Sequence, residues 1–138
     1  MVHNDLRAKH GSPALRWDDQ AAKAAQQWAD ELARTGDFRH GNYEGMGQNL
    51  FYNVGPEIPA QKVVEYWYGE IRHYDFNSPG FDENTGHFTQ VVWADTEGIG
   101  IGVKISNNRK MYVVANYTPP GNVQGGDNFR NNVRPLMS

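Results

Sequence analysis

The 138-residue sequence contains no cysteine. This absence excludes a disulfide framework, a thiolate metal site and a cysteine nucleophile together. It favours a cytosol-facing location in a reducing compartment, with secretion as the alternative, because secreted bacterial proteins can also lack cysteine. A chain of this length can bury a core without covalent cross-links.

Long apolar runs and a positive charge excess are also missing. No stretch approaches the roughly 18 consecutive apolar residues of a membrane span, and residues 1–4 do not read as a signal peptide. The 13 Lys and Arg are outnumbered by 16 Asp and Glu, which gives a net charge of −3. The basic residues are scattered among carboxylates, so nucleic acid is not an expected partner. Attraction to anionic lipid would require basic groups to cluster locally.

Hydrophobic periodicity predicts helices first and an antiparallel hairpin last. The predicted elements are a short helix over 2–9, a helix over 19–35, a strand over 48–52, a helix over 60–74 and strands over 99–105 and 111–117. Asp18 can cap the second helix and Gly36 can end it. Alternation of apolar residues with Gly and Lys marks the first strand of the hairpin. This order predicts an α+β domain with helices covering a sheet.

Glu70 is the first candidate for chemistry, because aromatic residues surround it on the predicted helix. Trp67 lies three residues away, and Tyr66 and Tyr74 lie four residues away. A carboxylate in such a place meets a cation, titrates abnormally or reaches water at a cleft edge. The alternative interpretation is a surface Glu that extends into solvent beside Arg72.

His87 and His40 are the other candidates. His87 lies between a glycine and an apolar helical run, where an imidazole can face a cleft or bind a metal. For both residues, a hydrogen-bonded structural histidine is the competing interpretation. His3, His10 and His73 show no special setting and are expected at the surface. No pair of histidines has the spacing of a zinc-protease helix.

Four segments carry a family resemblance in order and spacing over essentially the whole chain. They read His3-Asn4-Asp5-Leu6-Arg7, Trp67-Tyr68-Gly69-Glu70-Ile71, Gly86-His87-Phe88-Thr89-Gln90-Val91-Val92-Trp93 and Tyr112-Val113-Val114-Ala115-Asn116-Tyr117-Thr118-Pro119-Pro120-Gly121-Asn122. Together they resemble the CAP superfamily (cysteine-rich secretory, antigen 5 and pathogenesis-related proteins, with the SCP domain). Without cysteine, the chain is most similar to the Golgi-associated plant-pathogenesis-related proteins. The resemblance implies a single domain over 1–138 with a truncated N-terminal helix. The implied fold is a three-layer α-β-α sandwich around a central antiparallel sheet.

The resemblance also implies a central cleft with two His and two Glu, where a divalent metal, commonly zinc, binds. Carried over by position, these residues are His40, Glu70, His87 and Gln48, which stands where the family has its second Glu. Gln accepts and donates hydrogen bonds but has no charge and cannot be a general base. We therefore expect Zn²⁺ to bind weakly through His40 and His87, or only with excess metal. Glu44, four residues earlier in a glycine-rich loop, is a weaker substitute for the lost carboxylate.

Three functions remain open. In the first, the domain binds lipid, sterol or a membrane surface through an aromatic segment punctuated by Gly and Pro. Its contact candidates are Phe51, Tyr52, Val54 and Ile58, and the alternative is that these are core residues at a strand end and helix entry. In the second, the domain is a zinc-dependent hydrolase that uses Glu70 and His87, with His40. In the third, it is a self-associating interaction domain, for instance a homodimer. The missing carboxylate favours a binding module over an enzyme, and the resemblance favours a Golgi-membrane location over secretion.

Overall fold

The computed structural model describes residues 1–137. Its helices are α1 (Val2–Ala8), α2 (Asp19–Thr35), α3 (Ala60–Tyr68), α4 (Gly86–Val92) and α5 (Asn128–Asn132), with a 3-10 helix, η1 (Gly69–His73), after α3. Its strands are β1 (Arg16–Trp17), β2 (Gly47–Val54), β3 (Gly98–Ile105) and β4 (Lys110–Thr118). Within these residues no helix combines the length and apolar character needed to cross a bilayer.

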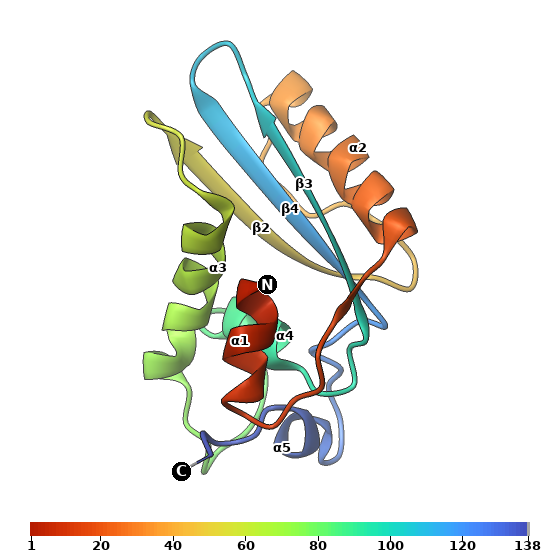
Figure 1. The fold of residues 1–138 in the computed structure, drawn as a ribbon, viewed down its shortest axis with the longest axis vertical. Helices are drawn as coiled ribbons and strands as arrows, with labels where there is room; N and C mark the ends of the chain where they lie inside the picture. Colours follow the sequence, from red (N-terminus) through yellow and green to blue (C-terminus); the bar gives the residue numbers. More distant parts are fainter. Residues whose placement is uncertain (138) are drawn as a thin grey trace.

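The four strands form one sheet in the order β1-β3-β4-β2. β3 and β4 pair antiparallel, as predicted, and β2 pairs antiparallel with the other side of β4. The two-residue β1 was not predicted and runs parallel to β3. The three long strands form the predicted antiparallel sheet, and the short parallel strand β1 makes the sheet mixed at this edge. α2 covers one face, and α1, α3 and α4 cover the other (Figure 1). These layers confirm the predicted α-β-α sandwich.

α2 lies close to the sheet because small residues face each other across the contact. Asp18 caps the helix by accepting the N–H of Ala21 at 3.0 Å, and Gly36 ends it at φ 72°. On β3, Gly100 and Gly102 face the helix, and a Cβ at either position would overlap the α2 backbone. The glycines that alternate with the aliphatic residues of β3 therefore permit the close approach.

Two hydrophobic clusters hold the three layers together. The cluster between α2 and the sheet consists of Ala25, Ala29, Leu32, Leu50, Tyr112 and Val114. The larger cluster lies on the opposite face and includes Trp67, Phe88 and Trp93, which are almost completely buried. Both clusters include alternating residues of β4, so the two faces of the sheet contribute to the two cores.

α3 is shorter than the sequence predicts. The apolar spacing predicts a helix as far as residue 74, but the α-helix ends at Tyr68 and continues as η1. The change begins at Gly69, and glycine is a poor helix former. From η1 the carboxylate of Glu70 reaches the backbone at the start of α4. A tertiary contact has thus replaced the last turn of the expected helix.

His3 and His10 are buried, which contradicts the expectation that they lie at the surface. Each is only 1% exposed. His3 Nε2 lies 2.7 Å from the Tyr117 hydroxyl, and His10 bonds the carbonyl of Arg134 and the hydroxyl of Tyr68. Burial lowers the pKa of His3 to about 3 and also lowers the pKa of His10. Their partners lie at least 58 residues away in the sequence, beyond the reach of local spacing.

Candidate functional site

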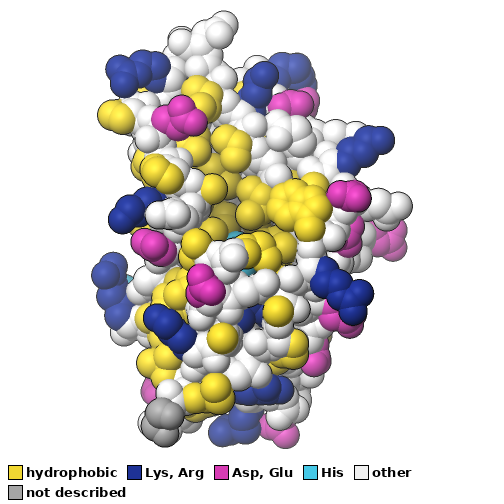
Figure 2. All heavy atoms as spheres, in the orientation of Figure 1, with side chains coloured by type: hydrophobic (Ala, Val, Ile, Leu, Met, Phe, Trp, Pro, Cys, Tyr) yellow, Lys and Arg dark blue, Asp and Glu magenta, His cyan; other side chains and the backbone are white. Residues whose placement is uncertain are grey.

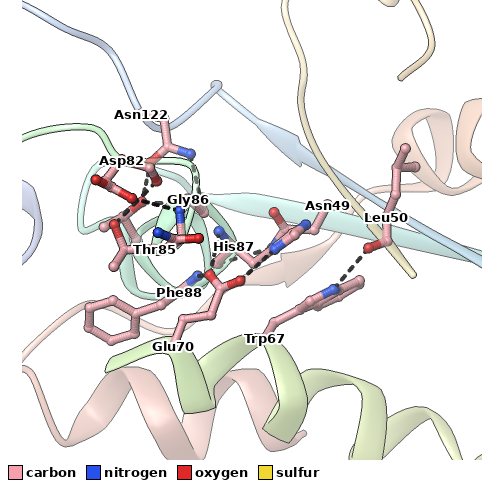
Figure 3. Close-up of polar contacts among 12 residues, drawn as sticks. Asn49, Leu50, Trp67, Glu70, Asp82, Thr85, Gly86, His87, Phe88 and Asn122 are labelled. Carbon is pink, nitrogen blue, oxygen red and sulfur yellow. Dashed lines mark hydrogen bonds and ion pairs between the residues drawn. The ribbon is translucent and has the colours of Figure 1, made fainter. Parts of the chain in front are cut away.

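Glu70 caps the N-terminal turn of α4 (Figure 3). One carboxylate oxygen accepts the backbone N–H groups of His87 and Phe88 at 2.9 and 3.0 Å. The other oxygen accepts Nδ1–H of His87 at 2.8 Å. The first N–H groups of a helix lack internal partners and attract a negative charge. Glu70 is therefore a structural anion that holds His87 in place.

His87 is also held on its other sides. Its ring stacks on Trp67, with centroids 6.1 Å apart and an interplanar angle of 13°, and its carbonyl accepts Nδ2–H of Asn49 at 3.1 Å. Trp67 is anchored in turn by donating to the carbonyl of Leu50 at 3.1 Å (Figure 3). Because Glu70 accepts a hydrogen bond from Nδ1–H, a neutral His87 carries its proton on Nδ1 and its lone pair on Nε2.

Gln48 holds His40 with an amide instead of a carboxylate. Its Oε1 accepts the backbone N–H of Gly41 at 2.9 Å, and His40 Nδ1 lies 3.0 Å from the same oxygen. A backbone N–H can only donate, so this atom is the acceptor and Nδ1 of His40 must carry a proton. Nε2 of Gln48 donates to Oδ1 of Asn116 at 2.9 Å, and Asn116 donates to the carbonyl of Ala21 at 3.4 Å. His40 thus also keeps its lone pair on Nε2, without a charge beside it.

His40, Gln48 and His87 line one cavity of about 250 Å³ beside the N-terminal end of β2. Its other lining residues are Asn49, Phe81, Glu83, Gly86 and Asn122. A larger hollow of about 790 Å³ shares Glu83 with this cavity and is lined partly by Glu70. The structure therefore places three of the four carried-over residues, His40, Gln48 and His87, around one cavity. Glu70 contacts His87 and lines the neighbouring hollow.

A chain of buried hydrogen bonds runs behind His87. Asn49, which bonds the His87 carbonyl, also donates to the Tyr117 hydroxyl at 3.3 Å. Burial raises the pKa of Tyr117, so the phenol keeps its proton. Since its oxygen accepts from Asn49, the phenol proton is directed to His3 Nε2. The chain is uncharged, so it positions α4 against β2 and β4 at little electrostatic cost.

The cavity brings together two imidazoles, those of His40 and His87, and imidazole is an appropriate ligand for zinc. Within residues 1–137, no group of three or more His, Cys, Asp or Glu is arranged to hold a metal, whereas catalytic zinc usually keeps three protein ligands. Glu44 is exposed and does not line the cavity. The residues present fit a two-imidazole site better than a catalytic zinc centre.

The lipid-contact candidates lie toward the other end of β2. Val54 is 57% exposed and Tyr52 is 39% exposed, whereas Phe51 and Ile58 are half-buried against the larger core. Phe51 and Tyr52 lie within the predicted strand over 48–52, and the observed strand continues to Val54, because β4 pairs with β2 throughout this stretch. Only Ile58 lies in the loop.

Two exposed aromatic residues that were not predicted as lipid contacts lie beside these candidates. Phe38 is 46% exposed and its ring centroid lies 5.6 Å from that of Tyr52. Tyr66 is 67% exposed and lies 5.6 Å from Phe51. No local pattern marks either residue, since each acquires its neighbour only through the fold. We call the group Phe38, Phe51, Tyr52, Val54 and Tyr66 the aromatic end.

Known proteins match both the sequence and the fold. A family model described as "CAP: Cysteine-rich secretory protein family" matches residues 1–117. The chain belongs to the CAP family. It is 38% identical over 137 residues to Golgi-associated plant pathogenesis-related protein 1 of Homo sapiens, covering 97% of this chain and 88% of that protein. It is 40% identical over 138 residues to Protein PRY2 of Saccharomyces cerevisiae, covering 97% of this chain but only 39% of PRY2.

Solved structures agree with this CAP fold. NaASP2, solved as a crystal structure with Zn²⁺, matches with a TM-score of 0.75 at 23% identity, covering 99% of this chain and 82% of that one. BmVAL-1 matches with a TM-score of 0.70 at 23% identity, covering 89% and 65% respectively. At these identities the likeness concerns the fold alone.

The residues that support His87 in this CAP domain are not among those predicted from the sequence. Asn49 bonds its carbonyl, and Asn122 donates to the carbonyl of Gly86 at 2.9 Å. Asn122 also accepts the Thr89 hydroxyl proton (Figure 3 shows Asn122 beside this turn). A signal was available, because Asn49 directly follows Gln48 and Asn122 ends the second signature. Their side chains hold the loop and helix from which His87 enters the cavity.

Proposed function

We propose that this CAP domain is a lipid- or sterol-binding module that associates with membrane surfaces and does not depend on catalytic turnover. The observation that carries the proposal is the exposure of the aromatic end. Phe38, Tyr52, Val54 and Tyr66 are between 39% and 67% exposed although other apolar residues fill both cores. Phe38 adjoins Tyr52 on the α2 side of the sheet, and Tyr66 adjoins Phe51 on the opposite side. Exposed apolar neighbours of this kind are typical of interaction sites.

The polar cavity supports binding over catalysis. Both oxygens of Glu70 are engaged by α4 and the His87 ring, so its carboxylate is not poised to move a proton. Gln48 cannot act as a general base. Gln48 and Glu70 occupy the two carboxylate positions of the family's cleft. Neither side chain is therefore free to act as a general base.

Two further proposals follow from the cavity and from the relatives. Zinc would bind weakly through Nε2 of His40 and His87, with water or an external ligand completing its coordination. The human relative is named for its association with the Golgi. By family membership, we extend a membrane-associated location to this chain.

A pair of substitutions at the aromatic end tests lipid or sterol binding. Tyr52→Ser with Val54→Ser removes two exposed apolar groups at the end of β2, and we expect sterol and phosphatidylcholine-vesicle binding to weaken about tenfold. The control is Val123→Ser with Leu136→Ser, since these residues are 47% and 55% exposed elsewhere. Circular dichroism and thermal unfolding should show an unchanged fold in both variants. A wild-type protein that binds neither lipid nor sterol, yet hydrolyses a peptide or ester in a zinc- and His87-dependent way, would overturn the proposal.

A further inference from the structure

His40 lies in a segment that has little structure of its own. Residues 36–46 join the end of α2 to the start of β2 without forming a helix or strand (Figure 1). Within the part of the chain that the structure describes, only one backbone–backbone hydrogen bond has both partners in this segment, from Met46 N–H to the Tyr43 carbonyl. His40 is exposed, and Gln48 is the hydrogen-bond partner of its ring. The position of this imidazole therefore depends on what holds the segment.

Trp28 of α2 contacts the segment on both sides of His40. Its Nε1–H donates to the carbonyl of Arg39 at 2.9 Å, and the Arg39 guanidinium lies 4.7 Å from the centroid of the indole ring. A Cβ added at Gly41 would lie 2.8 Å from Cδ2 of Trp28 and 2.7 Å from the ring of Tyr43, so a side chain there would displace the segment. The rings of Tyr43 and Trp28 meet edge-on, with centroids 6.2 Å apart. Trp28 thus contacts both chain neighbours of His40.

Trp28 is held by the core and not by the segment that it contacts. It extends from α2, where the neighbouring Ala25 and Ala29 are fully buried, and it packs against the cluster between α2 and the sheet. Hydrophobic side chains reach the surface at several places on the face that Figure 2 shows, so a partly exposed ring is not unusual in this protein. The contacts on both sides of His40 distinguish Trp28 from the other partly exposed aromatic residues.

We propose that Trp28 is a positioning residue for metal binding, which holds the His40 imidazole at the wall of the cavity that His87 also lines. The inference rests on the proposed zinc site and deepens it by naming the residue that orders one of the two ligands. A site gains affinity when its ligands are already in place, because ordering a loop on binding reduces the free energy gained. Glu70 already orders His87, so the order of His40 decides how well the pair is prepared for a metal.

Two substitutions at Trp28 separate the hydrogen bond from the ring. Trp28→Phe keeps an aromatic ring but removes the donor to Arg39, and one such hydrogen bond shifts an equilibrium about fivefold. Trp28→Ala also removes the ring beneath the Arg39 guanidinium, which contributes about threefold more. We therefore expect zinc affinity in calorimetric titrations to fall by up to about fivefold in Trp28→Phe and about fifteenfold in Trp28→Ala. Alanine is a strong helix former, so α2 should stay folded.

A matched control is Trp17→Phe, because Trp17 is 54% exposed on β1, at the edge of the sheet opposite β2. This variant should bind zinc as wild type does. In a His40→Ala background, Trp28→Phe should cause no further loss of zinc affinity, since the indole acts through this imidazole. Circular dichroism should show that Trp28→Phe unfolds at nearly the wild-type temperature. A purely structural role for Trp28 would instead lower that temperature and would not depend on His40.

Amide hydrogen exchange tests the same contact without metal. The N–H of Gly41 donates to Gln48 at 2.9 Å and should be protected in the wild-type protein. Loss of the Trp28 hydrogen bond should make this amide exchange up to about fivefold faster, because the segment then opens more often. The same amide should exchange at the wild-type rate in Trp17→Phe.

The outcomes separate this inference from the proposed function. If wild-type protein binds zinc and both Trp28 variants bind it as tightly, the positioning role is wrong and the zinc site stands. If wild-type protein binds no zinc, both are wrong, while vesicle and sterol binding still decide the lipid-binding module. Faster exchange at Gly41 with unchanged zinc affinity would show that Trp28 orders the segment without serving a metal, which overturns the assignment. An equal loss of zinc affinity in Trp17→Phe would overturn it as well.

Discussion

Replacing Gln48 by glutamate changes the charge of the polar cavity with little change in shape. The new carboxylate can still accept from Gly41 N–H and His40 Nδ1–H, and charge strengthens both hydrogen bonds. Its second oxygen would face Oδ1 of Asn116, to which Gln48 now donates at 2.9 Å. Asn116 must then turn its amide and lose its 3.4 Å bond to the carbonyl of Ala21.

The two effects of Gln48→Glu differ in size. We expect the free energy of unfolding to change by less than about 1 kcal/mol, because one long neutral hydrogen bond is lost while two others strengthen. Zinc affinity should rise about tenfold. A carboxylate about 7 Å from a dication on His40 Nε2 contributes about 1 kcal/mol even at the dielectric constant of water, and more in a partly shielded cavity. Tenfold corresponds to about 1.4 kcal/mol.

Calorimetric zinc titrations measure this effect with two controls. Gln61→Glu adds the same charge at an exposed position in the first turn of α3, and it should leave zinc affinity nearly unchanged. Gln48→Glu in a His40→Ala background should lose most of its effect, because the carboxylate acts through that imidazole. The reasoning is refuted if Gln48→Glu binds zinc no better than wild type, or if Gln61→Glu gains as much.

Two further predictions concern buried titratable side chains in α1. Stability should fall by up to about 1.4 kcal/mol per pH unit as pH drops below 6.5, because the unfolded state then binds a proton that His3, with its pKa lowered to about 3, does not accept. Urea unfolding at pH 7 and pH 5 measures this slope, and His3→Gln should remove its share while keeping an acceptor for the Tyr117 proton. Arg7 is fully buried and donates to the carbonyls of Val91, Trp93 and Thr96, and burial lowers its pKa to about 10, which leaves it charged at pH 7. Arg7→Lys keeps the charge but not the fork of donors, so thermal unfolding should show a loss of about 3 kcal/mol, and an unchanged midpoint would contradict this role.

Elements with local signals were predictable from the sequence. Asp18 and Gly36 mark the ends of α2, and the alternating glycines and aliphatic residues of β3 indicate both the strand and its partner. β1 has only two residues and no period to detect, so it exists only because β3 lies beside it. The end of α3 was misplaced because the contact between Glu70 and α4 forms only in the folded chain.

The sequence indicated which residues belong to the candidate site but not the structural role of each. The matching segments supplied Glu70 and His87, the family positions supplied His40 and Gln48, and the structure shows His40, Gln48 and His87 on one cavity. Spacing alone could not show that Glu70 is engaged by the first turn of α4. For the same reason His3, an unremarkable residue in the sequence, lies in the buried chain behind His87. Tertiary hydrogen bonds decide whether such a polar residue is buried.

The polar cavity and Val54 of the aromatic end lie at the two ends of β2. Gln48 and Val54 are six residues apart on this strand, a distance of about 20 Å, whereas Phe38 of the aromatic end is two residues from His40 of the cavity. Coupling between two sites requires an element that changes state with both ligands. β2 does not meet this requirement, because it pairs with β4 from Gly47 to Val54 and its central Leu50 is buried under α2. We therefore expect zinc and lipid to bind independently. Saturating zinc should leave vesicle affinity unchanged, and vesicles should leave zinc affinity unchanged, because linkage makes the two tests reciprocal. A shift of more than about fivefold in either titration, the lower end of typical allosteric coupling, would contradict this rigid separation.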